Sequence, residues 1–344
     1  MMREEENLYK KVKNHLCRKI FDGTYPDGGQ IPPERKLSEE LGVSRVTTRK
    51  ALKILEEERI ISRVQGSGTR VSMHYGARRG DMEIITLVAS AQNDFFTSFL
   101  DAFQTEADQW GSLVLYKQKP SRISLGECLY QLHEKGLYNI VLWPEDMRLR
   151  PERLKILRGL GMDLVLFDAP DGGAYADAVC MDNREAVVSL HTRLRQEGCE
   201  KIAYIGWDNS DIGSLWVREQ TFRELEPEGA IYPISYGYHN RLYGLPEASI
   251  RDALACMEGQ DGIIYAVGEL GMVFEEHAKR NGIVHRAGMI GAMPGAKELG
   301  IHVVAQDFTG MARQIFKCLQ RQNQEDVEDV WEACAYLVKG QQQF

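Results

Sequence analysis

The pattern of apolar residues changes near residue 83, and this change constrains the fold more than any other feature of the chain. Before it, apolar residues recur at helical spacing among many Lys and Arg side chains. After it, β-prone runs alternate with helical stretches, as in parallel α/β proteins. A chain of 344 residues also exceeds the usual size of a single core. We therefore expect a small domain over residues 1–72, a linker over 73–82 and an α/β domain over 83–344.

Charge is divided along nearly the same boundary. The whole chain has a formal net charge of −8. Residues 1–80 carry about +6, however, and the remaining residues carry about −14. A basic segment at one end of an acidic chain is typical of a nucleic-acid-binding domain.

The seven cysteines show neither a Cys-x-x-Cys pair nor a metal-ligand spacing. We expect buried free thiols in a reducing compartment, with no metal and no cofactor. The N-terminal segment lacks the apolar core of a signal peptide, and no apolar run reaches the roughly 18 residues of a membrane span. These features favour a cytoplasmic protein that does not enter a membrane. The short QQQF tail is the one low-complexity stretch.

Three helices are expected in the N-terminal domain. The first ends at Asp22–Gly23 and has an apolar stripe formed by Leu8, Val12, Leu16 and Ile20. A second short helix follows two prolines, buries Leu37 and Leu41, and ends at the tight turn that Gly42 permits. Ser44 is placed to cap the third helix.

The third helix, SRVTTRKALKILEEE, is the expected DNA-reading element. Its inner face consists of Ala51, Leu52 and Leu55. Arg45 and Arg49 lie one turn apart on the outer side of its N-terminal part. In the major groove, arginine grips guanine edges bidentately, and threonine hydroxyls reach bases or phosphates. The alternative is that these arginines merely solvate a helical face.

Two β-prone runs, 61–64 and 69–72, flank the sequence Gln65-Gly66-Ser67-Gly68 and predict a hairpin, or wing. A dinucleotide-binding loop is the alternative for Gly-x-Gly. That motif requires a third glycine, where this chain has Val71, and a following βαβ unit, which is absent.

The order LYKKVKNHL, IPPERKLSEELGVSRVTTRKALKILEEE and RVQGSGTRV resembles the GntR-type winged helix-turn-helix over the whole N-terminal domain. The resemblance implies that the arginine opening the second helix, the start of the recognition helix and the wing tip touch DNA. By matching position these are Arg35, Ser44, Arg45, Thr47, Arg49, Gln65 and Gly66. One departure is Thr48, where the family usually has an apolar residue that packs inward.

The β-like runs of the larger domain are EIITLVAS, SLVLYKQ, YNIVLW, DLVLF, KIAYIG, AIYPIS, GIIYAV, GMIGA and HVVAQ. Helices are expected between them, for example over 95–110, 184–197 and 268–281. Open parallel sheets bind ligands beyond the C-terminal ends of their strands. The pocket candidates are therefore Asn93, Asp94, Phe95, Trp143, Asp168, Trp207, Asp208 and Gln306. Such aromatic and polar groups suit a polyhydroxylated ligand, with core packing as the alternative for each tryptophan.

This domain resembles the effector domain of the lactose-repressor (LacI) family, which is itself similar to periplasmic sugar-binding proteins. The matching stretches are NDFFTSFLDAFQTEADQWG, VCMDNREAV, EGCEKIAYIG, VREQTF and VVAQDF. The resemblance implies a two-lobed periplasmic-binding-protein-like α/β fold with effector contacts from Asp182, Arg218 and Gln306. A GntR-type head on a LacI-type body resembles the arabinose-repressor architecture.

Two stretches depart from the LacI pattern. Val267-Gly268, followed by Glu269, stands where the family has Asn-Asp, and Gly291-Ala292-Met293 stands where it often has Gly-Phe-Asp. Two carboxylates that grip sugars are therefore absent, while Glu269 is retained as a candidate contact. A less anionic pocket would suit a sugar acid or sugar phosphate better than usual, beside a neutral sugar.

Together the two resemblances predict a ligand-responsive transcriptional repressor. A homodimer would bind a double-stranded DNA operator, and a small effector closing the cleft between the lobes would change head spacing and weaken binding. The alternatives are an α/β enzyme or a sugar receptor acting on a small carbohydrate. No His-x-x-x-His pair, G-x-S-x-G elbow or P-loop supports the enzyme. The basic head argues against the receptor.

Overall fold

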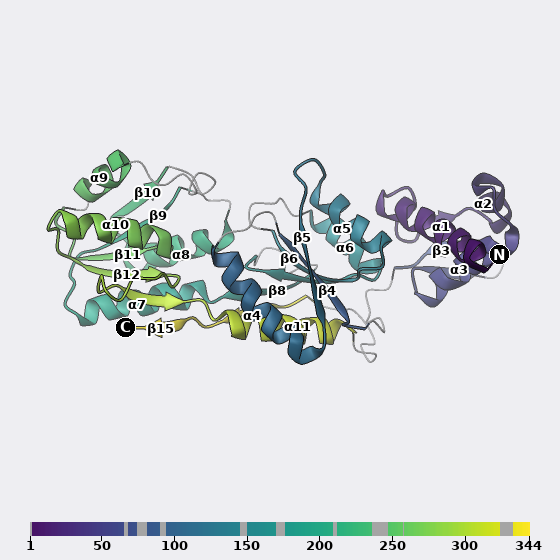
Figure 1. The fold of residues 1–344 in the computed structure, drawn as a ribbon. Coiled ribbons are helices and arrows are strands. Elements are labelled where there is room, and N and C mark those ends of the chain that lie inside the picture. Colours follow the sequence, from purple (N-terminus) through teal and green to yellow (C-terminus); the bar gives the residue numbers. More distant parts are fainter. Residues whose placement is uncertain are drawn as a thin grey trace. The chain divides into compact units, whose positions relative to one another are not determined.

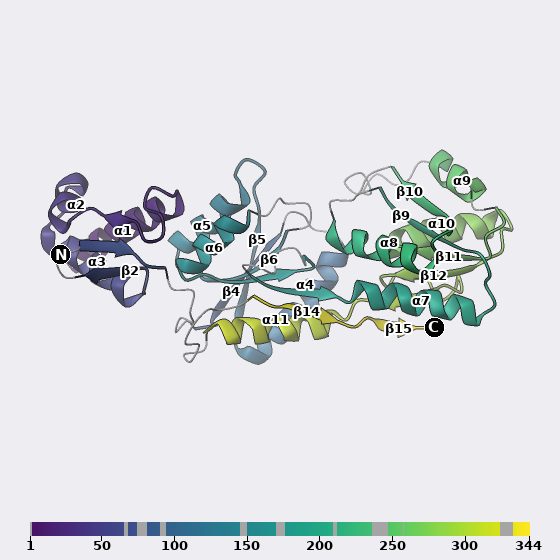
Figure 2. The same ribbon diagram turned by 180° about the vertical axis from the view of Figure 1, so that it is seen from behind.

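The computed structural model describes residues 2–64, 68–73, 81–89, 94–144, 150–169, 176–208, 212–235, 247–256, 258–323 and 333–344. The chain divides into two compact units (Figures 1 and 2). The first comprises Met1–Phe167, Gly172–Ala178 and Arg313–Cys334, and the second comprises Asp168–Asp171, Val179–Ala312 and Ala335–Phe344. The first unit contains the N-terminal head and one α/β lobe, and the second contains the other lobe.

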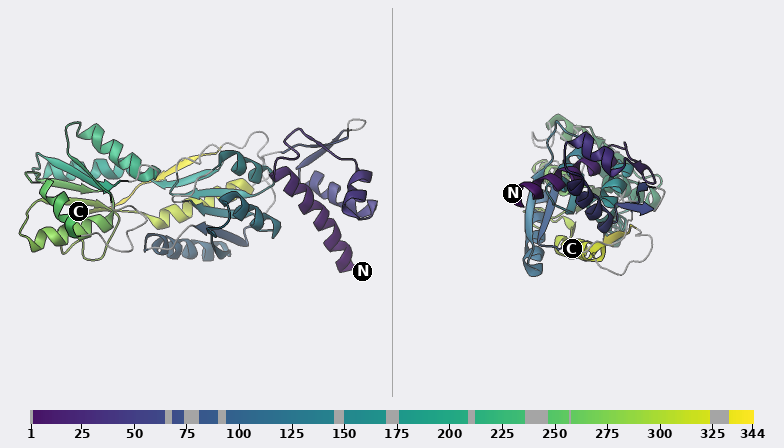
Figure 3. Two further views of the ribbon diagram at one scale, coloured as in Figure 1. Left: turned by 90° about the horizontal axis from the view of Figure 1, so that it is seen from above. Right: turned by 90° about the vertical axis from the view of Figure 1, so that its right-hand side faces the viewer.

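The head consists of three helices and a small antiparallel sheet, coloured purple to dark blue in Figure 3. The helices are α1 (Met2–Phe21), α2 (Glu34–Leu41) and α3 (Arg45–Glu57). The strands β1 (Gln30–Ile31), β2 (Ile61–Val64) and β3 (Gly68–Val71) pair in the order β1-β3-β2. The three helices and the hairpin predicted from the sequence are thus confirmed.

The core of the head forms where the apolar stripe of α1 packs on α3. Val12, Leu16 and Ile20 are buried, whereas Leu8, at the start of the stripe, is partly exposed. Thr48 occupies the inward position expected for an apolar residue and is fully buried. Its Oγ1 donates to the backbone oxygen of Ser44 over 3.3 Å. Because the hydroxyl is satisfied within the helix, a polar residue is tolerated in this core.

One six-stranded sheet has the order β14-β8-β7-β6-β4-β5, and its strands lie in the first unit except for β14 and the end of β8, which belong to the second. Its strands are β4 (Ile84–Ala89), β5 (Leu113–Gln118), β6 (Asn139–Trp143), β7 (Asp163–Phe167), β8 (Asp177–Met181) and β14 (Ala335–Val338). Helices α5 (Leu125–Glu134) and α6 (Pro151–Gly159) lie on one face, and α4 (Asp94–Trp110) and α11 (Phe308–Asn323) lie on the other (Figure 1). The first strand, β4, pairs in parallel with β5 on one side and β6 on the other. The strand order therefore reverses at β4.

The second lobe repeats this plan. Its sheet has the order β10-β9-β11-β12-β13-β15. The strands are β9 (Ile202–Trp207), β10 (Ile231–Ile234), β11 (Gly262–Tyr265), β12 (Arg286–Ile290), β13 (His302–Ala305) and β15 (Gln341–Gln343). The helices are α7 (Asn183–Gln196), α8 (Gly213–Leu225), α9 (Glu247–Cys256) and α10 (Gly268–Arg280). Here β9 is the strand at which the order reverses.

The β-like runs expected in the larger domain are confirmed as strands, but three of the strands described there were not anticipated. They are β8, β14 and β15. The QQQF tail is not a plain low-complexity end, because Gln343 pairs antiparallel with Val303 of β13. Backbone hydrogen bonds to an open sheet edge order this segment, although its side chains have little β-propensity. No helix among the described residues is long and apolar enough to cross a membrane.

Candidate DNA interface and effector site

The N-terminal end of α3 is fixed by the turn that precedes it. Gly42 adopts the left-handed conformation, with φ 62°, and its N–H bonds the oxygen of Ser38 to close α2. Two residues later Ser44 caps α3, and its Oγ accepts a hydrogen bond of 3.1 Å from the backbone N–H of Thr47. The predicted cap is confirmed, and it leaves the first turn of α3 with its N–H groups pointing outward.

The side chains predicted to touch DNA are exposed around this helix end. Arg45 and Arg49 are 65% and 62% exposed. Arg35, on α2, is also exposed and donates to Glu39 one turn along its own helix over 2.9 Å. A cationic surface built from two helices is therefore available to a phosphate backbone or a base edge.

Two residues near this helix end were missed by sequence reasoning. The carboxylate of Glu34, the first residue of α2, accepts hydrogen bonds from Arg49 Nε and Nη2 over 3.1 and 3.0 Å. Its Oε1 also lies 3.7 Å from Arg45 Nε. Val46 is 75% exposed in the first turn of α3. Glu34 and Arg49 are 15 residues apart on different helices, so no sequence periodicity predicts their contact. Val46, in contrast, could have been noted from the sequence as an apolar residue between Arg45 and Thr47.

The wing can be followed only in part. Gln65 and Gly66 lie outside the described residues. The strands on either side, β2 and β3, pair from Ile61↔Val71 to Val64↔Gly68. Gly68 has φ +89°, a conformation that side-chain-bearing residues rarely adopt. Arg70 Nη1 donates to the oxygen of Gly28 over 3.1 Å, which holds the base of the wing on the head.

In the first unit, two of the predicted effector residues lie together. Phe95 contacts Trp143 with ring centroids 5.5 Å apart. Trp143 is also nearly parallel to Phe96, at 5.3 Å, and is buried. Asn93 lies outside the described residues, and Asp94 begins α4. Phe95 comes after β4 and Trp143 ends β6, at the point where the strand order reverses and open sheets bind ligands.

In the second unit, Arg218 is the centre of a buried polar group. Arg218 of α8 is 4% exposed and donates from Nε to Asn183 Oδ1 over 2.7 Å and from Nη1 to the oxygen of Ala266 over 2.6 Å. Asp182, beside Asn183, caps α7 by accepting from the N–H of Glu185. These residues come from segments that follow β8, β9 and β11. The fold thus brings Arg218 to the carboxyl edge of the sheet.

The other candidates of this unit also follow strand ends. Trp207 closes β9 and is buried, and its Nε1 has no hydrogen-bond partner within the described residues. Asp168 follows β7 with a positive φ of 53°. The remaining positions are Asp208 after β9, half-buried Glu269 in the first turn of α10, and Gln306 after β13. A buried donor without an acceptor is costly, so the Trp207 indole is a candidate for a ligand oxygen.

The two segments that depart from the LacI pattern, Val267-Gly268 and Gly291-Ala292-Met293, lie next to each other. A β-carbon added to Gly268 would lie 2.6 Å from the oxygen of Gly291 and the same distance from Cγ of Met293. Gly291 itself has φ +106° and faces Gln306. Close backbone packing therefore occupies the space that an aspartate at position 268 would need.

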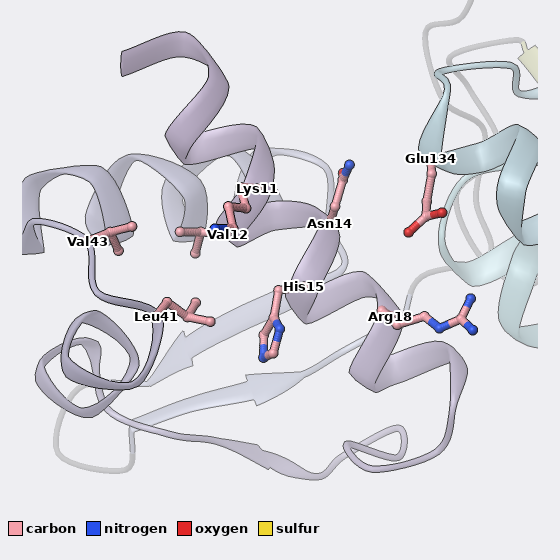
Figure 4. A pocket seen from close by; sticks show the side chains of 8 residues that line it. All are labelled: Lys11, Val12, Asn14, His15, Arg18, Leu41, Val43 and Glu134. Carbon is pink, nitrogen blue, oxygen red and sulfur yellow. The ribbon is translucent and has the colours of Figure 1, made fainter. Parts of the chain in front are cut away.

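A cavity of about 260 Å³ lies on the head in the first unit (Figure 4). Arg18 points from α1 toward α5, where it pairs with Glu127. Burial, followed by the charge of Lys19, lowers the pKa of His15. The lining residues are Lys11, Val12, Asn14, His15, Arg18, Leu41, Val43 and Glu134. Of the charged lining residues, Arg18 pairs with Glu127 and Asp22, while Lys11 and Glu134 are exposed.

Among the described residues, none of Cys17, Cys128, Cys180, Cys199, Cys318 and Cys334 forms a disulfide, and all of them except Cys334 are buried. Burial raises the pKa of Cys318 to about 12 and also raises the pKa of Cys128 and Cys199. These thiols are therefore protonated and unreactive at neutral pH. Within the described ranges no three His, Cys, Asp or Glu side chains are grouped as a metal site would require.

Comparison with known proteins follows the division of the chain. Residues 8–71 match the profile of the family described as bacterial regulatory proteins, gntR family. The repressor MngR of the mannosyl-D-glycerate transport/metabolism system of Escherichia coli K12 is 42% identical over 64 residues, which are 19% of this chain and 27% of that protein. The chain thus matches about a quarter of the length of this curated relative.

The rest of the chain is similar to solved LacI-type structures. The Cra regulator of Pseudomonas putida, in complex with fructose 1-phosphate, aligns with a TM-score of 0.61 and 14% identity over 76% of this chain and 98% of that one. A LacI regulator from Lactobacillus brevis gives 0.63 and 13%, over 76% and 100%. Residues 8–71 are therefore a GntR-type DNA-binding domain, and the remainder has the two-sheet fold of LacI-type, periplasmic-binding-protein-like effector domains.

Proposed function

We propose that this chain is a ligand-responsive transcriptional repressor that acts in the cytoplasm. In this proposal the GntR-type head binds an operator, and a small carbohydrate-like molecule bound to the LacI-type region releases it. The observation that carries the proposal is the capped N-terminal turn of α3, where Arg45 and Arg49 are exposed on a head that matches a family of bacterial regulators.

The proposed DNA contacts divide by chemistry. Arg45 and Arg49 would read base edges in the major groove, while Arg35, Ser44 and Thr47 would hold phosphates and fix the register. The exposed Val46 is suited to the methyl group of a thymine. Gln65 and Gly66 of the wing remain proposed contacts at a neighbouring groove.

The proposed effector site is supported by the buried polar groups of the second unit. Arg218 is fixed by Asn183 and Ala266, so its guanidinium is pre-oriented at the strand ends. The indole Nε1 of Trp207 supplies a buried donor. A planar cation suits vicinal hydroxyls, a carboxylate or a phosphate. The phosphosugar in the Cra regulator of P. putida and the glycerate derivative in the name of MngR agree with a sugar, sugar acid or sugar phosphate here.

The proposed homodimer is supported by an apolar patch on an open sheet edge. In register on β4 and β5, Ile84 pairs with Leu113, and the next outward residue of β5 is Leu115. All three are exposed, Leu113 by 70%. Exposed apolar side chains on an edge strand mark an interaction site, and a second copy would cover them. A two-fold dimer would then read two half-sites of a symmetric operator.

Selection from a pool of random DNA duplexes tests the proposal. We expect enrichment of a two-fold symmetric sequence and tight binding that weakens steeply with salt. A thermal-shift screen of sugars, sugar acids and sugar phosphates would then identify the effector, because a ligand of the folded state raises the melting temperature. Failure to enrich any sequence, or turnover of a carbohydrate by the protein, would contradict the repressor assignment.

A further inference from the structure

Glu34 binds Arg49 and lies near Arg45, the two arginines exposed in the N-terminal part of α3. Its two carboxylate oxygens accept from the Nε and Nη2 atoms of Arg49, and Oε1 also approaches Arg45. Glu34 is only 21% exposed, whereas its arginine partners are mostly exposed. The carboxylate thus sits behind the arginines, on the side of the protein, and their outer surfaces face solvent.

The geometry of the pair leaves one edge of Arg49 for a ligand. A guanidinium carries five N–H donors in a planar fork. Glu34 occupies the edge formed by Nε and Nη2. The end formed by Nη1 and Nη2 still carries two parallel N–H groups, which match O6 and N7 of a guanine. The free protein therefore already holds Arg49 in a bidentate orientation, and little rotamer freedom remains to be lost on binding.

The charge of Glu34 acts differently on bases and on phosphates. A carboxylate repels a phosphate that approaches the same arginines, whatever the DNA sequence. The edge of a guanine is uncharged, so this repulsion is much weaker there, and the carboxylate still holds the guanidinium in its orientation. A residue of this kind lowers affinity for random DNA and favours the matching base pair.

We propose that Glu34 is a positioning residue that sets sequence specificity by acting through Arg49. This inference rests on the proposed function, because it assumes that the head reads an operator. Glu34 need not touch DNA itself to determine how well the head distinguishes the operator from other sequences.

The test compares affinity for the selected operator with affinity for a scrambled duplex at one salt concentration. We expect Glu34→Gln to lower the ratio of the two affinities by about tenfold or more, with affinity for scrambled DNA unchanged or increased. Glu39→Gln is the matched control. It removes the same charge from the same helix, but Glu39 pairs with Arg35 on α2. This control should keep the ratio within about threefold of the wild type.

A double-mutant cycle establishes whether Glu34 acts through Arg49. In an Arg49→Ala background, we expect Glu34→Gln to change the ratio by less than about threefold. Circular dichroism and the melting temperature confirm that each variant is folded. Equal increases in both affinities for Glu34→Gln would overturn the inference, because Glu34 would then be only a competing charge. An undiminished effect of Glu34→Gln in the Arg49→Ala background would overturn it too.

Failure of the proposed function looks different. In that case the wild-type protein itself would not distinguish any selected duplex from a scrambled one. A wild type that discriminates well, together with a Glu34→Gln variant of unchanged ratio, would contradict only the role of Glu34.

Discussion

The ring of Phe21, the last residue of α1, stacks on the ring of Tyr130 in α5, with centroids 4.5 Å apart and planes inclined by 24°. Arg18 lies over the Tyr130 ring at 4.8 Å, and the Tyr130 hydroxyl donates to the oxygen of Asn14 over 3.2 Å. Since α1 also packs on α3, a continuous packed path leads from the lobe of the first unit to the recognition helix.

Removal of the Tyr130 ring should weaken this path. We expect the operator affinity of Tyr130→Ala without effector to stay within about threefold of the wild type. Effector typically lowers affinity by roughly 5- to 150-fold in allosteric proteins, and we expect this decrease to become smaller or to disappear in the variant. Anisotropy titrations with and without effector provide the measurement. A Tyr130→Ala variant with full effector response would show that the stack only joins the head to the lobe.

The same residue should make stability depend on alkaline pH. Burial raises the pKa of Tyr130 well above its usual value. An unfolded tyrosine loses its proton near about pH 10, so the stabilising contribution is complete below about pH 10 and is lost as the pH rises toward the folded pKa. Between about pH 8 and 10.5, we expect the melting temperature of Tyr130→Phe to fall by less than that of the wild type. Parallel losses in the two proteins would contradict this prediction.

Arg45 should read one base pair in each half-site. We expect Arg45→Ala to cost about 1 to 3 kcal/mol of binding free energy and to relax specificity at one position per half-site. Titrations against operators substituted at each position would locate that base pair. Equal affinity of the variant and the wild type for the selected operator would remove Arg45 from the interface.

The base of the wing should depend on Gly68. Its φ is +89°, a conformation that side-chain-bearing residues rarely adopt, and a β-carbon added there would lie 3.1 Å from Nε2 of the Gln30 side chain, which would have to shift. Gly68→Val should weaken operator binding while the three helices of the head remain folded. Gly282→Val, at φ +66° in the second unit, is the matched control for backbone strain alone. Equal binding by the two variants would exclude the wing from the contact surface.

Local patterns predicted much of the fold. Helical stripes, the Ser44 cap and the β-prone runs each follow from short-range preferences, and the structure has them where they were expected. Strand β15 escaped prediction because backbone pairing to β13, and not its glutamine side chains, orders it. The role of Glu34 was not predicted, because its partner Arg49 lies on another helix. Asn183 lay in the quoted stretch VCMDNREAV, yet only the fold shows that it orients Arg218.

Arg218 should connect effector binding to release. We expect Arg218→Ala to keep operator affinity within about threefold, because the head is unchanged, and to raise the effector concentration needed for release by at least about tenfold. Since Arg218 is buried, the melting temperature without effector must be measured alongside. Release of the variant at the wild-type effector concentration would show that Arg218 only supports the fold of its lobe.

A single titration shows whether one chain couples binding of an operator to binding of a small molecule. The wild-type protein is bound to its selected operator, and fluorescence anisotropy is followed as the effector found by thermal shift is added. We expect operator affinity to fall by about 5- to 150-fold at saturating effector, and operator DNA to weaken effector binding by the same factor. Operator affinity that stays constant at saturating effector would contradict this expectation.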